Sequence, residues 1–239
     1  MTTYFISDLH LSENRQDITD CFLNFLHELE NERPDALYIL GDLFEMWIGD
    51  DESNPFLKTI RSALRRLTSV GIPCFFIHGN RDFLIGHQFS RETGVQLLDE
   101  HTVIDLYGQP TLLLHGDTLC TDDKEYQKFR KRVHMRWLQT LFLALPLKWR
   151  VNIGQKIRSQ SAQSNQQKSG KVLNVALADT EQQFTRHNVT RIIHGHTHQP
   201  NTHQHSAGER IVLGDWYDQG SILRCNRDGQ CELLTRHFS

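Results

Sequence analysis

The sequence has no long hydrophobic run. Its longest apolar stretch, residues 141–147, contains a proline, Pro146, whereas a helix that spans a membrane needs about 20 apolar residues. The opening residues MTTYFISDLH contain neither the basic nor the apolar segment of a secretory signal. These absences argue against a membrane-spanning or exported protein and predict a cytoplasmic location.

Cysteines are few and show no pattern. The chain has five of them, an odd number, and none forms a Cys-x-x-Cys pair. In a cytoplasmic chain this predicts neither a disulfide framework nor a sulfur-rich metal site. The five are Cys21, Cys74, Cys120, Cys225 and Cys231.

The net charge of −3 conceals an uneven distribution. Between Lys124 and Lys171 the sequence has twelve Lys and Arg residues and one acid, Glu125, whereas the rest of the chain is acidic. A solvated basic helix face is one explanation for such a segment. Binding of an anionic partner, such as a phosphate, a nucleic acid or a membrane surface, is the other.

Short apolar runs alternate with helical patterns along much of the chain. Five runs rich in β-branched and aromatic residues are typical of strands buried on both faces, and helical repeats separate the first three. This alternation predicts a layered α/β domain closed by antiparallel strands. The runs are 4–8, 37–42, 74–80, 112–115 and 191–196, the helical repeats 18–29 and 56–70, and the closing strands 211–213, 221–223 and 231–234.

Residues 122–171 interrupt this alternation. They contain a helical repeat from Tyr126 to Leu141, an apolar patch stopped by Pro146, and a polar Ser/Gln/Asn stretch at 159–170. We predict a single domain over residues 1–239, with 122–171 as a helical insertion over the core that includes a flexible polar loop.

Each of the five strand-like runs ends in a residue that can bind a metal. Open α/β sheets bind ligands at the carboxyl ends of their strands, and carboxylates with imidazoles suit Mn²⁺, Fe²⁺ or Zn²⁺. A single Asp or His at a strand end is commonly a cap or a core residue, but five in succession favour a metal site. The motifs are Asp8-Leu9-His10, Gly41-Asp42, Gly79-Asn80-Arg81-Asp82, His115-Gly116-Asp117 and His194-Gly195-His196-Thr197-His198.

In this order the motifs resemble the calcineurin-like metallophosphoesterase superfamily, over residues 8–198. The resemblance implies a β-sandwich core flanked by helices, here with a helical insertion cap. It also implies two divalent metal ions, for which we expect Mn²⁺, that clamp a phosphoryl group and provide a hydroxide ion to attack phosphorus. It assigns Asp8, His10, Asp42 and His198 to one ion and Asp42, Asn80, His115 and His196 to the other, with Asp42 shared.

Arg81 departs from the superfamily pattern, in which a histidine commonly follows the asparagine. Arginine can bind a phosphate through two N–H groups but cannot act as a general acid near neutral pH. The leaving group should therefore need little protonation, as when a phosphate monoester leaves from a pyrophosphate. This favours an anhydride substrate over an alkyl phosphodiester.

Longer sequence blocks resemble the UDP-2,3-diacylglucosamine hydrolase family over essentially the whole chain. The blocks are 6–11, 41–50, 78–84, 114–123 and 194–200. This resemblance implies a step of lipid A biosynthesis, in which attack at the α-phosphorus of UDP-2,3-diacylglucosamine gives UMP and 2,3-diacylglucosamine 1-phosphate (lipid X). It implies catalytic roles for Asp42, Asn80, Arg81 and His196, and substrate contacts from Asn80, Arg81, Asp123, Ser161, Asn165, Lys168 and His196.

The insertion suits a substrate with acyl chains and phosphates. Arg158 and Lys168 are candidates to face phosphate, and flanking basic residues to contact the anionic cytoplasmic face of the inner membrane as a peripheral attachment. We expect no nucleic acid and no obligate protein partner. Apolar residues of the insertion either line an acyl slot or pack onto the core: Leu138, Leu141, Phe142, Leu143, Leu145, Leu147 and Trp149. Trp47 is likewise either a substrate contact or a buried residue.

Three alternatives remain open. A nucleotide phosphodiesterase or protein phosphatase of the same fold is disfavoured by Arg81 and by the apolar insertion. A non-catalytic binding module is disfavoured because all seven metal-ligand positions carry competent residues. RNA binding by the basic segment is disfavoured because it lacks an interleaved aromatic platform, and Trp137 and Trp149 lie among aliphatic residues instead.

The other acidic and histidine residues near the motifs are assigned to structural roles. Asp82, Asp117 and His194 are expected to support neighbouring groups or the strand core. Asp215, in a second Gly-Asp pair, is interpreted as a coincidence. Exposed loop positions are expected for Asp50, Asp51, Glu52, His203 and His205.

Overall fold

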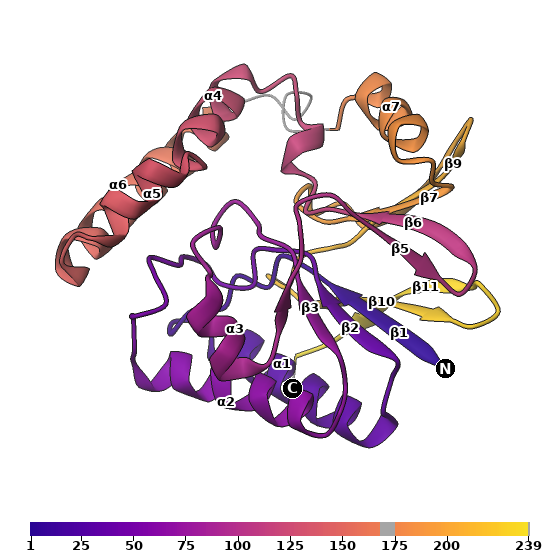
Figure 1. The fold of residues 1–239 in the computed structure, drawn as a ribbon, viewed down its shortest axis with the longest axis horizontal. Coiled ribbons are helices and arrows are strands. Elements are labelled where there is room, and N and C mark those ends of the chain that lie inside the picture. Colours follow the sequence, from indigo (N-terminus) through magenta and orange to yellow (C-terminus); the bar gives the residue numbers. More distant parts are fainter. Residues whose placement is uncertain (168–174, 239) are drawn as a thin grey trace.

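Two β-sheets form the centre of the computed structural model, which describes residues 1–167 and 175–238 (Figure 1). The first has the order β11-β10-β1-β2-β3-β4 and the second β5-β6-β7-β9-β8. The strands of the first sheet are β1 (Thr2–Ile6), β2 (Ala36–Ile39), β3 (Cys74–Phe76), β4 (Gln96–Leu97), β10 (Gly220–Asn226) and β11 (Cys231–Arg236). Those of the second are β5 (Thr102–Leu106), β6 (Gln109–Leu113), β7 (Arg191–His194), β8 (Asn201–His205) and β9 (Gly208–Val212).

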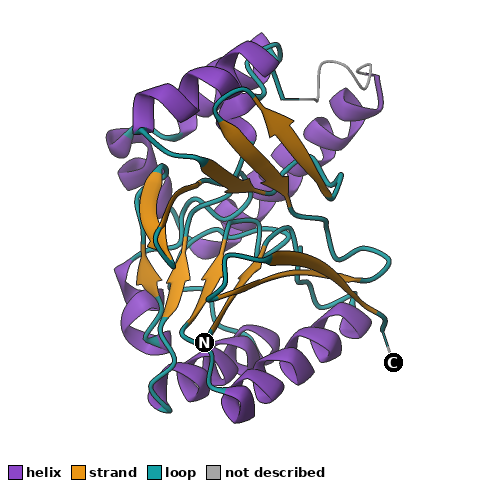
Figure 2. Cartoon of the chain, turned by 90° about the vertical axis from the view of Figure 1, so that its right-hand side faces the viewer, coloured by secondary structure: helices purple, strands orange, loops and turns teal. Residues whose placement is uncertain are grey.

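Helices cover the outer faces of this sandwich (Figure 2). Helices α1 (Gln16–Glu32), α2 (Pro55–Ser69) and α3 (His87–Thr93) pack on the first sheet, and α7 (Leu177–His187) packs on the second. Helix α2 begins where the sequence signals a start, because Asn54 Oδ1 accepts a hydrogen bond from Leu57 N and Pro55 occupies the first turn.

The alternation of side chains along β1 shows why its residues Tyr4 to Ile6 are all apolar. Tyr4 and Ile6 pack into the core beneath α1 and α2, whereas Phe5 packs against the second sheet with Ile193 and Ile211. A strand buried on both faces is therefore a near-continuous apolar run. The predicted layered α/β sandwich and its five strand-like runs are confirmed.

The predicted closing antiparallel strands are confirmed for β10 and β11 and in part for β9, whereas the loop predicted around His203 and His205 is wrong. Strand β9 pairs in parallel with β7 and antiparallel only with β8. The segment predicted as an exposed loop around His203 and His205 is the edge strand β8, and the His205 ring is nearly buried between Glu181 and Arg210. Its polar composition concealed the strand, because an edge strand can keep polar side chains while pairing on one side.

The cysteine prediction is also corrected. Cys225 and Cys231 face each other across β10 and β11 and form a disulfide, with their Cα atoms 4.1 Å apart. The count and spacing of cysteines could not reveal this pair, because the hairpin register brings the two positions together. Cys21, Cys74 and Cys120 are buried and free.

The insertion forms a helical arm of α4 (Lys124–Val133), α5 (Arg136–Leu143) and α6 (Leu147–Gln167) that projects from the sandwich (Figure 1). Residues 159–167, predicted as a flexible loop, continue α6, so that prediction is wrong as far as the structure describes the segment. The exact limits 122–171 stay a prediction. Among the described residues, no helix is both long and apolar enough to cross a membrane.

Candidate metal centre

The loops that follow β1, β2, β3, β6 and β7 meet at the carboxyl ends of the strands. Their backbone is unusual, because most of the predicted metal ligands have a positive φ angle that non-glycine residues rarely adopt. Such strain persists only where the surrounding structure enforces it, and it clusters at functional sites. The φ values are 55° for Asp8, 51° for His10, 51° for Asp42, 69° for His196 and 55° for His198.

Two glycines allow these loops to approach each other. A Cβ atom at Gly79 would lie 2.2 Å from Asp42 Oδ1, and one at Gly195 would lie 2.2 Å from Asp8 Oδ2. Neither position can accept a side chain without displacing a predicted metal ligand. The glycines of the Gly-Asn and Gly-His motifs are therefore needed for close packing around the carboxylates.

The first group of ligands consists of Asp8, His10 and His198. His198 Nε2 lies 3.3 Å from Asp8 Oδ1 and 3.5 Å from His10 Nε2, and the three ligand atoms could share one ion. Asp8 is fully buried, and Asp8 Oδ1 and His10 Nδ1 have no well-formed hydrogen bond within the described chain. Buried polar atoms without partners fit a bound cation.

The second group of ligands surrounds the Asn80 side chain. Asn80 Oδ1 lies 3.0 Å from both His115 Nε2 and His196 Nδ1, and His115 Nε2 lies 3.8 Å from Asp42 Oδ2. Asp8 and Asp42 also lie close enough to share an ion with His115. The structure therefore brings all seven predicted ligands together, and the chemistry of the donor set fits two divalent ions.

The charges of this cluster are strongly coupled. Burial opposes the charge of His115, but Asp42 and Asp8 attract its proton and raise its pKa to about 9. Burial likewise opposes the charge of His198, whose pKa Asp215 and Asp8 raise to about 10. Histidine protons thus compensate the buried carboxylates, and a divalent cation bound by the same atoms would replace them.

Further groups orient the ligands. His115 Nδ1 lies 2.8 Å from Leu40 O, to which it can donate, leaving Nε2 toward the centre. Buried Asp82 accepts backbone hydrogen bonds from Asp42, Leu43, Phe44 and Gly79, so its predicted supporting role is confirmed. His194 is fully buried, as predicted.

Asp215 is a functional residue that the sequence interpretation missed. Its Oδ2 lies 2.9 Å from His198 Nδ1, so Asp215 fixes the ring with Nε2 toward the first ligand group. The interpretation as a coincidence is wrong. The signal was present in the sequence, because Gly214-Asp215 follows β9 as Gly41-Asp42 follows β2.

We expect Asp215→Asn to weaken metal binding about 10- to 100-fold, since carboxylates behind a ligating histidine orient the ring and raise its basicity. Calorimetric titration of the metal-stripped protein measures this affinity. Asp228→Asn, in an exposed turn, is the matched control. Equal affinities for the wild type and Asp215→Asn would contradict the role of Asp215.

The predicted substrate residues are only partly placed. Arg81 Nε lies 3.4 Å from Asp42 Oδ2, and Asn80 Oδ1 lies 3.0 Å from His196 Nδ1. Asp123 is buried and caps α4, with Oδ1 accepting from Tyr126 N at 3.1 Å. Ser161 and Asn165 belong to α6 but their side chains are outside the described structure, and Lys168 lies outside the described residues altogether.

Helix α4 is attached directly to the His115 loop. Asp117 Oδ2 accepts hydrogen bonds of 2.6 Å from Tyr126 Oη and Arg130 Nε, which confirms its predicted supporting role. The Tyr126 ring stacks on His196, with centroids 6.2 Å apart. Tyr126 is therefore a second residue at the site that its place in a helical repeat did not reveal.

The loop after β2 is ordered by its acids, contrary to the prediction of a solvated loop. Asp50 accepts hydrogen bonds from Trp47 Nε1, Gly86 N and Phe89 N. Trp47 is buried, which decides between the two alternatives for it. Asp51 pairs with Arg150 of the arm, and burial raises the pKa of Glu52.

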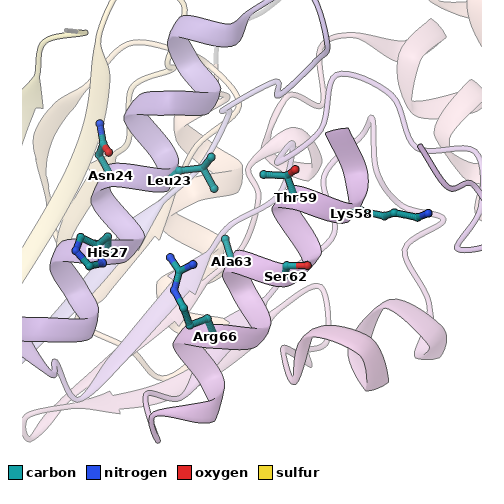
Figure 3. Close-up of a pocket in the computed structure, with 8 residues that line it drawn as sticks. All are labelled: Leu23, Asn24, His27, Lys58, Thr59, Ser62, Ala63 and Arg66. Atoms are coloured by element: carbon teal, nitrogen blue, oxygen red, sulfur yellow. The ribbon is translucent and has the colours of Figure 1, made fainter. Parts of the chain in front are cut away.

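Two cavities accompany these elements. One, of about 480 Å³, lies between the loop after β2 and α6 and is lined by Glu45, Met46 and Arg158 among others. The other, of about 540 Å³, lies between α1 and α2 and is lined mostly by polar and basic side chains, together with Leu23 and Ala63 (Figure 3). No predicted site residue lines this second cavity, so only the first adjoins the candidate centre.

Known proteins match the chain over its length. A family model for calcineurin-like phosphoesterases matches residues 1–200. The UDP-2,3-diacylglucosamine hydrolase of Photobacterium profundum is 56% identical, over all of this chain and 98% of that protein, and the one of Vibrio parahaemolyticus is 51% identical, over all of both. A solved archaeal phosphodiesterase shares the fold at 9% identity, with a TM-score of 0.53 over 98% of this chain and 99% of that one. The chain therefore belongs to the calcineurin-like phosphoesterase family and, within it, to the group of UDP-2,3-diacylglucosamine hydrolases.

Proposed function

We propose that this chain hydrolyses the pyrophosphate bond of UDP-2,3-diacylglucosamine, with attack at the α-phosphorus, to give UMP and 2,3-diacylglucosamine 1-phosphate in lipid A biosynthesis. The observation that carries the proposal is the full-length likeness to proteins named for this substrate. The convergence of seven metal-capable residues at one end of the sandwich supplies the matching chemistry.

The side chains of the centre have distinct roles in this reaction. When bound, two divalent cations, Mn²⁺ in our proposal, would supply Lewis-acid activation of the phosphoryl oxygens and lower the pKa of a water molecule. Asn80 and His196 face the same point and would hold a phosphoryl group in line with the attacking water. Arg81 neutralises charge on the phosphates, and because it cannot give up a proton the lipid phosphate departs as an anion.

The test is an assay of the purified chain on UDP-2,3-diacylglucosamine in ¹⁸O-labelled water. We expect metal-dependent release of UMP that carries the label, because attack at the α-phosphorus places the water oxygen there. Label in the lipid phosphate would contradict the site of attack. Equal rates on a cyclic nucleotide, with no preference for the acylated sugar, would favour the phosphodiesterase alternative.

The helical arm supports a proposal about the lipid part of the substrate. None of the seven apolar residues predicted to line a slot or pack onto the core is buried, and Trp137 is exposed as well. Exposed aromatic residues beside Lys and Arg are typical of surfaces that contact anionic lipid. We propose that the arm takes up the acyl chains and rests on the cytoplasmic face of the inner membrane.

We expect the double variant Trp137→Ser, Trp149→Ser to bind vesicles of phosphatidylglycerol and phosphatidylethanolamine at least about tenfold more weakly, since burying each ring in lipid contributes about 1.5–3 kcal/mol. Sedimentation with vesicles measures the binding. Val103→Ser removes another exposed apolar residue, on β5 and away from the arm, and is the control. Unchanged partitioning of the double variant would rule out the arm as the lipid-contacting surface.

A further inference from the structure

Glu45 stands three residues beyond Asp42 and contacts three separate parts of the chain. Its Oε2 forms an ion pair with Arg81 Nη1 and lies 3.5 Å from His10 Nδ1. Its Oε1 forms an ion pair with Arg158 Nη2 on α6. One carboxylate therefore joins the loop after β3, the first ligand group and the helical arm.

The two arginines pair with different oxygens of the Glu45 carboxylate. Arg81 belongs to the Asn80 loop and also reaches Asp42 through Nε, whereas Arg158 belongs to the arm, whose other attachments to the sandwich include Asp51 and Asp117. Without a shared acceptor two guanidinium groups repel each other, and their long side chains sample many rotamers. The Glu45 carboxylate offsets this repulsion and restricts the rotamers of both side chains.

Both arginines keep N–H groups that do not bind the shared carboxylate. Within the described chain, Arg81 Nη2 and the Nε and Nη1 groups of Arg158 have no hydrogen-bond acceptor. Glu45 and Arg158 also line the cavity of about 480 Å³ beside the first ligand group. Both guanidinium groups are thus held by Glu45 with N–H groups left to bind an anion, and Arg158 also lines the cavity.

We propose that Glu45 is a positioning residue that aligns Arg81 and Arg158 to bind the two phosphates of a diphosphate substrate together. The inference rests on the proposed function, since it assigns the arginines to the pyrophosphate. Glu45 acts through the arginines and touches no reacting atom. It also couples the arm to the catalytic loop, because Arg158 can take its place only when α6 lies against the loop after β2.

The test is a double-mutant cycle on the metal-loaded enzyme with Glu45→Gln and Arg158→Ala. Glutamine keeps the shape of Glu45 but carries no charge and has only one acceptor oxygen, so it cannot hold both arginines. We expect Glu45→Gln to lower kcat/KM about 10- to 100-fold, mostly through KM, with unchanged metal content and melting temperature. We expect the loss of kcat/KM in the double variant to be clearly smaller than the product of the two single losses, because Glu45 acts in part through Arg158.

Multiplicative effects in the cycle, or wild-type kinetics for Glu45→Gln, would overturn the proposal. A purely structural role would lower the melting temperature and leave the cycle additive. Glu92→Gln is the matched control. Glu92 forms a 2.9 Å ion pair with Arg61 that is remote from the metal centre, so the kinetics of this variant should equal those of the wild type.

Calorimetric binding of UMP separates this proposal from the proposed function. We expect Glu45→Gln to weaken UMP binding by the metal-loaded protein about tenfold, whether or not the lipid substrate is turned over. Loss of UMP binding without any hydrolysis of UDP-2,3-diacylglucosamine would refute the proposed function and keep the role of Glu45. Normal UMP binding and normal hydrolysis in the variant would refute the role of Glu45 alone.

Discussion

Asp42→Ala should lower kcat/KM for hydrolysis of the lipid substrate at least about 1,000-fold, equivalent to about 4 kcal/mol of transition-state stabilisation. Asp42 lies at the junction of the centre, with its carboxylate near His115 Nε2 and Arg81 Nε and its Oδ1 accepting from Arg81 N at 2.9 Å. Removing the carboxylate deletes a predicted shared metal ligand. It also leaves the charges of Arg81 and His115 without their partner.

Kinetics together with elemental analysis of bound metal test this expectation. Because burial raises the pKa of Asp42, its ionised side chain does not stabilise the metal-free fold, and we expect the variant to remain folded. Asp42→Asn keeps one oxygen ligand, so its kcat/KM should lie between the values of the wild type and of Asp42→Ala. Asp20→Ala, at an exposed position on α1, is the control. Near-wild-type turnover by Asp42→Ala would disprove the assignment of the centre.

Arg81→Ala is expected to lower kcat/KM about 100- to 1,000-fold, which is below the largest effects of arginines that stabilise phosphoryl transfer. Arg81 lies beside Asp42 and is held by Glu45, so its guanidinium is already oriented toward the centre. Arg81→Lys should recover only a small part of the loss, because an ammonium group cannot reproduce the planar two-point contact. The metal content should not change, since Arg81 is not a ligand.

Steady-state kinetics on the lipid substrate and on a 2′,3′-cyclic nucleotide, a diester with an alkoxide leaving group, provide the measurement. Arg81→His should gain activity on the diester relative to the lipid substrate, because histidine can protonate a poorer leaving group. Arg91→Ala, at an exposed position on α3, is the control. Full activity of Arg81→Ala on the lipid substrate would show that Arg81 has no role in the reaction.

Much of the core could be predicted because buried strands reveal themselves locally. Phe5 needs to be apolar since it faces the second sheet, and its neighbours Tyr4 and Ile6 need to be apolar since they face the helices. A continuous apolar run therefore marks a central strand. The edge strand β8 carries no such signal, because only one of its sides is paired and its residues from Asn201 to His205 can stay polar.

The sequence by itself determined the layered fold and the set of residues that meet at the strand ends. That information is local, because a strand end, a close-packing glycine and a metal-capable side chain fit within each motif. Which partner several of the orienting side chains meet was decided by the tertiary structure alone. Asp215 meets His198, Glu45 meets Arg158 from 113 positions away, and Tyr126 meets His196. Such pairs have no fixed spacing along the chain, because their distance depends on how the loops and the arm pack.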